Sequence, residues 1–207
     1  MLSPNLKRTV DKSDIVVYNI IILWADLPLS MRRKDGIHMK NNNTYKLVLA
    51  GLFAALCCIS TFIHIPTFFT MGYVNLGDCF VIASGLLLGP VWGAAAGGIG
   101  SMLTDLILGY ATYAPGTLII KAAMAVVASL IYSKCSFGEN KILSKVIAAI
   151  YGEIVMVGGY FVYEYFILAY GYAAVSSIAG NLLQAAAGII AAIPVTTIIE
   201  RSKLIKK

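Results

Sequence analysis

Apolar residues gather into six segments in the later part of the chain. These segments cover residues 46–64, 76–90, 92–109, 115–133, 145–169 and 174–198. A helix needs about 20 mostly apolar residues to cross the hydrocarbon core of a bilayer. Between the second and third segments, Pro90 breaks a helix, and Gly89 and Gly93 allow a tight reversal. The pattern therefore predicts an all-α membrane protein with six transmembrane helices, of which the second and third are short.

Composition agrees with a membrane protein. Hydrophobic residues make up 59% of the 207 residues and charged residues only 13%, and the mean hydropathy is +0.81. Soluble domains are about half apolar and a quarter charged. A net charge of +6 is compatible with nucleic-acid binding, but the positions of the basic residues favour another explanation.

Lysines and arginines occur on one side of the predicted topology. The loops at 65–75, 110–114 and 170–173 contain none. Because basic residues accumulate in cytoplasmic loops, we expect both termini to be cytoplasmic, the three uncharged loops to face outward, and no nucleic-acid partner. The basic residues on the cytoplasmic side are Lys40, Lys46, Lys134, Lys141, Lys145, Arg201, Lys203, Lys206 and Lys207.

Residues 1–38 differ from the rest of the chain. Their one apolar run, 15–24, includes Asn19 and is about half as long as a spanning helix. No small-residue cleavage site of a signal peptide follows it. Met39 then opens a short basic tail. We expect residues 1–38 to be a non-native extension upstream of the true start, or a disordered or peripheral segment, and residues 39–207 to form the six-helix domain.

Small residues predict close helix packing. Gly93, Gly97 and Ser101 in the third segment have the spacing that lets a neighbouring helix approach. The first segment carries two pairs of small residues at the same spacing, Ala50 with Ala54 and Gly51 with Ala55.

Ionisable and amide side chains interrupt the apolar segments at similar depths. At a rise of 1.5 Å per residue, Asp78, Asp105, Lys121, Glu164 and Asn181 all fall in the outer half of the predicted bundle. Charged groups inside a span are unfavourable and usually mark a site. The alternatives are hydrogen bonding between helices without a ligand and, for Asp78, capping of a helix N-terminus.

Helical periodicity also indicates the direction in which these polar residues face. In each of the last three segments the polar residues lie on one stripe, so we expect the stripes to face one another around a polar cavity. The stripes comprise Thr117, Lys121 and Met124; Glu153, Tyr160 and Glu164; and Ser177, Asn181, Gln184 and Gly188. Tyr110 and Tyr113, in an outer loop, suit either a flat ring ligand or the membrane interface. The candidate substrate-binding residues are Asp78, Asp105, Tyr110, Tyr113, Lys121, Tyr160, Glu164, Asn181 and Gln184.

Motifs for catalysis are absent from the sequence. It has no P-loop, no HExxH zinc motif and no G-x-S-x-G nucleophile elbow, and its four cysteines lack metal-binding spacing. We expect no catalytic residue, metal or cofactor. The alternatives are an intramembrane enzyme that uses Asp78, Asp105 and Glu164, and a purely structural membrane protein.

The stretch from Gly72 to Ala125 resembles a known family. Its elements NLGD, GP-x-x-G, GGIGS-x-L-x-D and P-x-TLIIK are similar to those of the S components of energy-coupling factor (ECF) vitamin transporters, riboflavin type. The resemblance implies a vitamin-binding subunit in a prokaryotic plasma membrane, which works with a transmembrane coupling (T) subunit and two cytoplasmic ATPases. Family members dock through an AxxxA pattern on the first helix, which Ala50 and Ala54, or else Gly51 and Ala55, would supply here.

The sequence indicates the substrate less directly than it indicates the family. Candidate carboxylates outnumber lysines, which favours a neutral or cationic ring such as pyridoxine, hydroxymethylpyrimidine or a thiamine-like molecule. Riboflavin is the alternative that the family label favours. Asp105 and Lys121 flank a predicted hairpin, so they are expected either to pair with each other or to bind the ligand.

Overall fold

The computed structural model describes residues 42–66, 73–134 and 140–202. The predictions for residues 1–38, and those for Lys40, Lys203, Lys206 and Lys207, fall outside these ranges. The described elements are α2 (Asn42–Phe62), β1 (His64–Pro66), β2 (Tyr73–Asn75), α3 (Gly77–Leu88), α4 (Pro90–Leu108), α5 (Ala114–Lys134), α6 (Lys141–Val162), the π-helix η2 (Tyr163–Ile167), the 3-10 helix η3 (Gly171–Ala173) and α7 (Ala174–Arg201).

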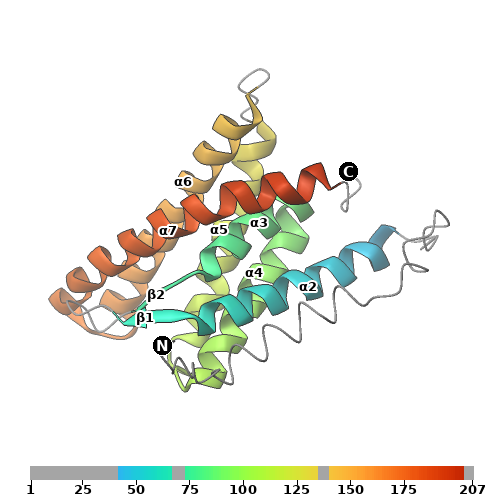
Figure 1. The fold of residues 1–207 in the computed structure, drawn as a ribbon. Coiled ribbons are helices and arrows are strands. Elements are labelled where there is room, and N and C mark those ends of the chain that lie inside the picture. Colours follow the sequence, from blue (N-terminus) through green and yellow to red (C-terminus); the bar gives the residue numbers. More distant parts are fainter. Residues whose placement is uncertain (1–41, 67–72, 135–139, 203–207) are drawn as a thin grey trace, which may run out of the picture. The chain divides into compact units, whose positions relative to one another are not determined.

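Six α-helices lie within the described residues, one for each predicted segment (Figure 1). Five of them are long and apolar enough to cross a membrane. The sixth, α3, has 12 residues, and at 1.5 Å per residue it is only about 18 Å long. It packs against α2, α4, α5 and α7, and nearly all its residues are buried. The prediction of six helices is confirmed, but α3 is an enclosed core helix rather than a full-length span. The prediction that the third helix is short is wrong, since α4 has 19 residues and is long enough to cross a membrane.

A glycine turn joins α3 to α4, as predicted. Gly89 has a positive φ of 88°, a conformation that favours glycine, and Pro90 begins α4 directly after it. Four residues further on, a Cβ atom at Gly93 would lie 2.6 Å from the Gly85 Cα. The predicted close packing at Gly93 is therefore confirmed, and its partner is the backbone of α3.

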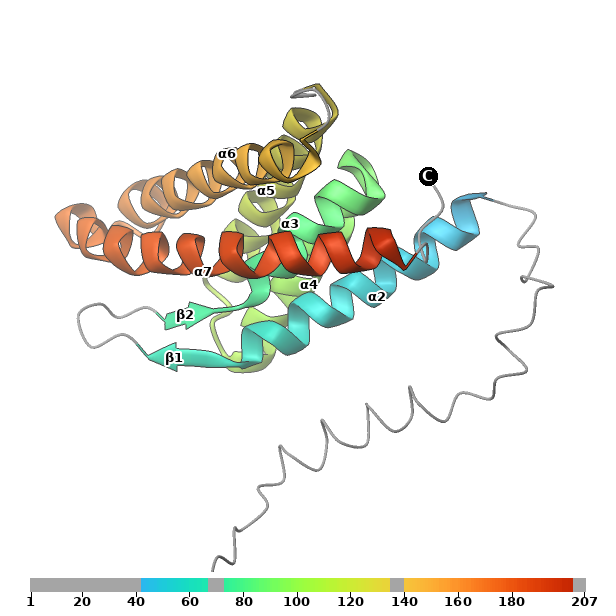
Figure 2. The ribbon, with the colours of Figure 1, turned by 45° about the horizontal axis from the view of Figure 1, so that its top comes forward.

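A short antiparallel hairpin was not predicted. β1 and β2 pair with His64 opposite Asn75 and Pro66 opposite Tyr73, in a region that the sequence indicated only as an uncharged outer loop. Figure 2 shows the two strands extending from the end of α2 to the start of α3. The hairpin fixes where Asn75 enters the helical bundle.

The outside of the bundle is apolar. Large apolar side chains on five helices are more than half exposed, among them Leu47, Val91, Ile119, Ile154 and Ile190. Soluble monomers rarely expose so much contiguous apolar surface. Together with the five long apolar helices, this surface is that of a protein whose helices contact lipid.

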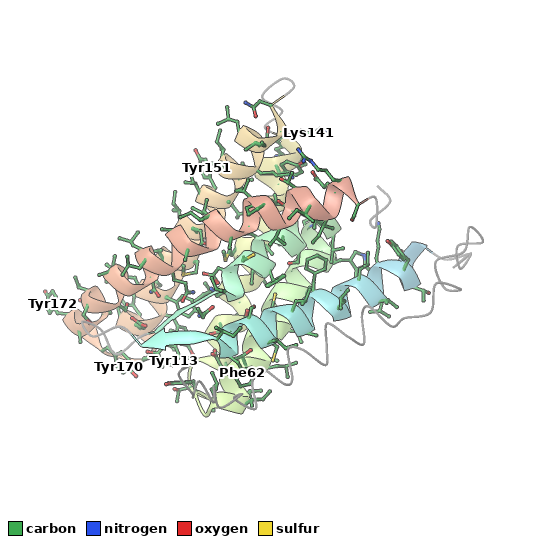
Figure 3. The ribbon with its side chains drawn as sticks, in the orientation of Figure 1. Phe62, Tyr113, Lys141, Tyr151, Tyr170 and Tyr172 are labelled. Atoms are coloured by element: carbon green, nitrogen blue, oxygen red, sulfur yellow. The ribbon has the colours of Figure 1, made fainter. Side chains whose placement is uncertain are left out.

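The two ends of the bundle differ in composition. Tyr113, Tyr170 and Tyr172 lie at the end where α6 turns into α7, whereas Lys141 lies at the opposite end (Figure 3). We call these the tyrosine end and the lysine end. Views from two directions also place the start of α2 and the end of α7 together, away from the hairpin (Figures 1 and 2).

Lys145, one of the basic residues predicted on the cytoplasmic side, lies inside a helix. α6 begins four residues before it, at Lys141. The Lys145 side chain is buried, and its Nζ lies 2.8 Å from Glu200 Oε2. It also donates a hydrogen bond to Thr197 Oγ1 at 3.1 Å. A buried lysine needs such partners, and α7 supplies them.

Candidate functional site

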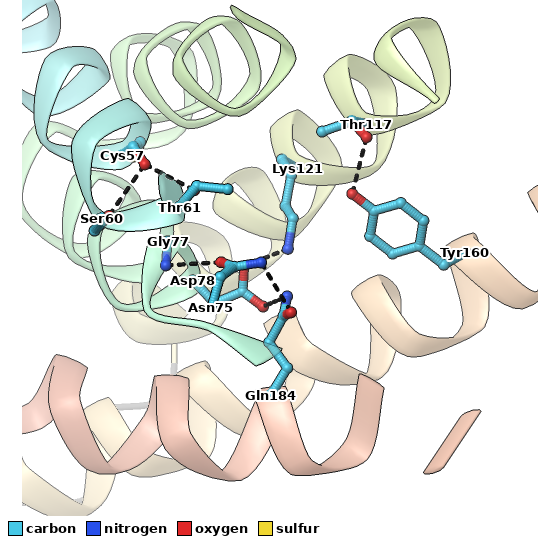
Figure 4. Close-up of polar contacts among 10 residues, drawn as sticks. All are labelled: Cys57, Ser60, Thr61, Asn75, Gly77, Asp78, Thr117, Lys121, Tyr160 and Gln184. Carbon is cyan, nitrogen blue, oxygen red and sulfur yellow. Dashed lines mark hydrogen bonds and ion pairs between the residues drawn. The ribbon is translucent and has the colours of Figure 1, made fainter. Parts of the chain in front are cut away.

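A buried ion pair lies between α3 and α5. Asp78, in the first turn of α3, pairs through Oδ1 with Lys121 Nζ of α5 (Figure 4). The other carboxylate oxygen, Oδ2, accepts a hydrogen bond at 2.8 Å from Gln184 Nε2 of α7. All three side chains are buried. Three helices that are distant in sequence therefore meet at one carboxylate.

Asn75 extends this network to the hairpin. Its Oδ1 accepts a hydrogen bond at 2.8 Å from the Gly77 amide, and its Nδ2 donates one at 2.9 Å to Gln184 Oε1. Asn75 thus satisfies a backbone donor at the start of α3, while the Asp78 carboxylate faces Lys121 and Gln184. Ion pairing, rather than the alternative role of helix capping, accounts for Asp78.

Glu153 of α6 brings a second carboxyl group to the same place. It is only 3% exposed, and neither of its oxygens has a hydrogen-bond partner among the described residues. A Cβ atom built on Gly188 of α7 would lie 2.6 Å from Glu153 Oε1 and 2.9 Å from Asp78 Cβ. Glu153 and Asp78 therefore meet against the same glycine.

An aromatic ring covers the ammonium group. Lys121 Nζ lies 5.4 Å from the centroid of the Tyr160 ring, within the range of a cation–π interaction. The Tyr160 hydroxyl donates a hydrogen bond at 3.0 Å to Thr117 Oγ1 (Figure 4). We call Asn75, Asp78, Thr117, Lys121, Glu153, Tyr160 and Gln184 the central cluster.

Asp105 lies beside the central cluster but does not pair with Lys121 in the structure. It is buried, within electrostatic reach of Lys121 and within hydrogen-bonding reach of the Thr117 hydroxyl, and its Oδ2 has no hydrogen-bond partner among the described residues. Of the two predicted alternatives for Asp105 and Lys121, pairing with each other is not observed, because Lys121 pairs with Asp78 instead. The reason is that α3 packs against α5 and presents Asp78 to the ammonium group.

A second group of predicted residues lies at the tyrosine end. The Tyr113 hydroxyl donates a hydrogen bond at 3.4 Å to Oε1 of Glu164, a buried residue of the π-helix η2. Burial, with the Glu164 carboxylate beside it, raises the pKa of Tyr113 well above its usual value, so its hydroxyl remains a donor. The Tyr113 ring also lies edge-on to that of Tyr110, with centroids 6.5 Å apart. π-Helical turns occur often at functional sites.

The predicted residues thus divide between two places. Asp78, Lys121, Tyr160 and Gln184 lie in the central cluster, whereas Tyr110, Tyr113 and Glu164 gather at the tyrosine end. Asn181 is half-buried on α7, one turn before Gln184 and in neither group. Sequence reasoning did not select Asn75, Thr117 and Glu153. The first lies in the NLGD element, and the other two lie on polar stripes that the periodicity had identified.

The two small-residue pairs of α2 face different surroundings. Ala50 is buried in an apolar cluster with residues of α3 and α4, and a Cβ atom on Gly100 would lie 2.4 Å from the Ala54 carbonyl oxygen. Gly51 and Ala55 are exposed. The second pair is therefore the one on the outward face of α2.

Six apolar helices around buried polar residues define a multi-pass membrane protein. Within the described part of the chain, no group of three His, Cys, Asp or Glu residues could hold a metal ion.

Comparison with known proteins identifies the family. A family model described as "ECF-type riboflavin transporter, S component" matches residues 41–201. A Pyrococcus woesei protein described as "Uncharacterized protein in gap 3'region" is 35% identical over 136 residues, which cover 66% of this chain and 88% of the relative. The chain belongs to the ECF-type riboflavin transporter S component family, so the resemblance is confirmed. It is a transporter component and not an intramembrane enzyme.

Proposed function

We propose that this chain is the substrate-binding subunit of an ECF-type importer and that it captures a vitamin-sized ring compound from outside the cell. The observation that carries the proposal is the central cluster. Four helices and the hairpin place carboxyl, ammonium, amide and hydroxyl groups inside an otherwise apolar bundle. Buried polar groups within a membrane protein are unfavourable and are commonly kept for a ligand or a transport pathway.

Riboflavin is the first substrate to test, because the matching family model is of the riboflavin type. A second candidate class comprises pyridoxine, hydroxymethylpyrimidine and thiamine-like rings. A specific observation favours it: three buried carboxyl groups, Asp78, Asp105 and Glu153, surround one ammonium group, Lys121. Such a surplus of negative groups suits a ligand that carries hydrogen-bond donors or positive charge.

The orientation in the membrane follows from the two ends of the bundle. Lys134, Lys141 and Arg201 lie at the lysine end, which we place on the cytoplasmic side of a prokaryotic plasma membrane by the distribution of basic residues. The tyrosine end then faces outward, where aromatic side chains suit the membrane interface. Both termini are cytoplasmic in this orientation.

Family membership suggests which proteins are the partners of this chain. We propose that the chain works with a T subunit and two cytoplasmic ATPases, and that α2 contacts the T subunit through its exposed small residues. Gly51 and Ala55 are available for this contact, whereas Ala50 and Ala54 already pack against α3 and α4.

A binding screen followed by an uptake assay tests the proposal. The purified full chain is titrated with riboflavin, pyridoxine, hydroxymethylpyrimidine and thiamine, and we expect nanomolar to low-micromolar affinity for one of them. Cells should accumulate that vitamin only when the T subunit and both ATPases are co-expressed. Absence of binding by all four vitamins at micromolar concentrations would contradict the proposal.

A further inference from the structure

Glu153 is the residue of the central cluster whose hydrogen-bonding capacity is unused. Asp78, the other carboxylate in the cluster, has one oxygen paired with Lys121 and the other bonded to Gln184. Glu153 is as deeply buried, but both of its oxygens are without partners among the described residues. An ionised carboxylate in such a position is strongly unfavourable unless it is paired.

The side chains next to Glu153 make their hydrogen bonds to other residues. Lys121 pairs with Asp78 and lies over the Tyr160 ring. The Gln184 amide uses its nitrogen for Asp78 and its oxygen for Asn75. Asp78 and Lys121 are the charged groups within electrostatic reach of Glu153, and the Asp78 carboxyl group lies beside it. Among the described residues, no side chain of this network donates a hydrogen bond to either Glu153 oxygen.

The backbone of α7 makes room for this carboxyl group. Gly188 has no side chain at the point where a methyl group would lie 2.6 Å from Glu153 Oε1. The carboxyl group is thus accommodated between α6 and α7 rather than excluded by packing. A larger residue at position 188 would force Glu153 to move.

We propose that Glu153 binds the ligand directly and accepts a hydrogen bond from a ring nitrogen that carries a hydrogen atom. This inference rests on the proposed function and specifies which group of the ligand is recognised. Two kinds of ring supply such a group: a neutral imide, as in riboflavin, and a protonated pyridine or pyrimidine. A charged N–H group would also neutralise the carboxylate, which makes its hydrogen bond stronger.

Ring N-methylation provides the test, because it removes the hydrogen atom and leaves the rest of the ring in place. Dissociation constants are measured for the full chain with riboflavin and 3-methylriboflavin, and with pyridoxine and N-methylpyridoxinium. For the vitamin that binds, we expect the N–H form to be preferred over the N-methyl form by about 10-fold or more, the effect of one good hydrogen bond to a charged group. In Glu153→Leu this preference should disappear.

A second variant separates the two kinds of ring. Glu153→Gln keeps an oxygen acceptor but removes the charge. A neutral imide should therefore lose less than about 10-fold in affinity, whereas a cationic ring should lose about 10-fold to 100-fold. Glu153→Gln also serves as the measured variant if Glu153→Leu does not fold, which gel filtration and thermal unfolding will show.

Glu200→Gln is the matched control, since it removes a carboxylate from α7 near the lysine end. It should keep the preference for the N–H form. If Glu153→Leu, or Glu153→Gln with a cationic ring, retains the full preference of the unmodified chain, the assignment of Glu153 is overturned while vitamin binding stands. If the unmodified chain binds none of the parent vitamins, the proposed function and this inference both fail.

Discussion

The two buried ion pairs within the described part of the chain differ in how completely they are satisfied. Near the lysine end, Lys145 contacts Glu200 and Thr197, and the Tyr132 hydroxyl donates to the other oxygen of Glu200 at 3.3 Å. One positive and one negative group meet there, and Glu200 is 24% exposed. In the central cluster, Lys121 pairs with Asp78 while both Glu153 oxygens have no partner within the described residues, and neither does one oxygen of the adjacent Asp105.

This difference separates a structural pair from a candidate site. A buried pair whose groups are all bonded needs nothing further and connects α6 to α7. A buried cluster with unused acceptors is less stable than an apolar replacement would be. A ligand that donates hydrogen bonds to these acceptors would explain why they are unused. We therefore propose a structural role for the Lys145 pair and ligand binding for the central cluster.

The largest effect is expected from Lys121→Met. The change leaves Asp78 and Glu153 buried without a cation, which should lower the free energy of unfolding by about 3–5 kcal/mol and abolish detectable vitamin binding. Calorimetric titration and thermal unfolding in detergent measure the two effects.

The double variant Asp78→Leu/Lys121→Met provides the control. It should recover much of the lost stability, because neither member of the pair remains, yet still fail to bind the vitamin. Binding by the double variant at the affinity of the unmodified chain would show that the central pair is structural too.

Lys145→Met should affect stability without affecting recognition. Glu200 is partly exposed and keeps its bond to Tyr132, so the loss should be smaller, about 1–3 kcal/mol. The dissociation constant of the folded protein should stay within a few-fold of that of the unmodified chain. A large loss of affinity in folded Lys145→Met, measured beside Lys121→Met, would remove the distinction between the two pairs.

Gly188→Ala should produce an intermediate effect at the central cluster. The added methyl group would lie 2.6 Å from Glu153 Oε1, and such overpacking typically costs about 1–3 kcal/mol. We expect ligand affinity to fall about 10-fold as Glu153 moves, which is about 1.4 kcal/mol of binding free energy.

Gly158→Ala is the matched control for this change, since a Cβ atom at Gly158 meets no atom within 4 Å. It should bind like the unmodified chain. Equal affinities for the two alanine variants would mean that the space beside Glu153 does not matter for recognition.

The smallest effect is expected from Tyr113→Phe. The variant loses a long hydrogen bond of 3.4 Å to Glu164 but keeps the ring, so a loss of about 1 kcal/mol or less is expected. Affinity should change by only a few-fold in the same titration. A loss as large as that of Lys121→Met would move the recognition site from the central cluster to the tyrosine end.

The sequence predicted the helices well because their signals are local. Apolar length and the Gly89–Pro90 break depend on neighbouring residues, and so does the periodicity that placed Lys121, Glu153 and Gln184 on polar stripes. The shortness of the second segment was also visible, although its enclosure by four helices was not, since hydropathy does not distinguish lipid from a protein core.

Pairing between helices could not be predicted in the same way. Depth alone made Asp105 as good a partner for Lys121 as Asp78, and the choice depends on how α3 packs against α5. Asn75 was overlooked because its role requires the hairpin to meet α7. The buried pairing of Lys145 was not predicted either, because Glu200, which pairs with it, is 55 residues further along the chain.

The most direct test of the account is an experimental structure of the full chain with its vitamin bound. The account predicts that a ring nitrogen of the vitamin lies within hydrogen-bond distance of the Glu153 carboxyl group, while the pair between Lys145 and Glu200 is unchanged. A vitamin bound elsewhere, with both Glu153 oxygens still without partners, would contradict it.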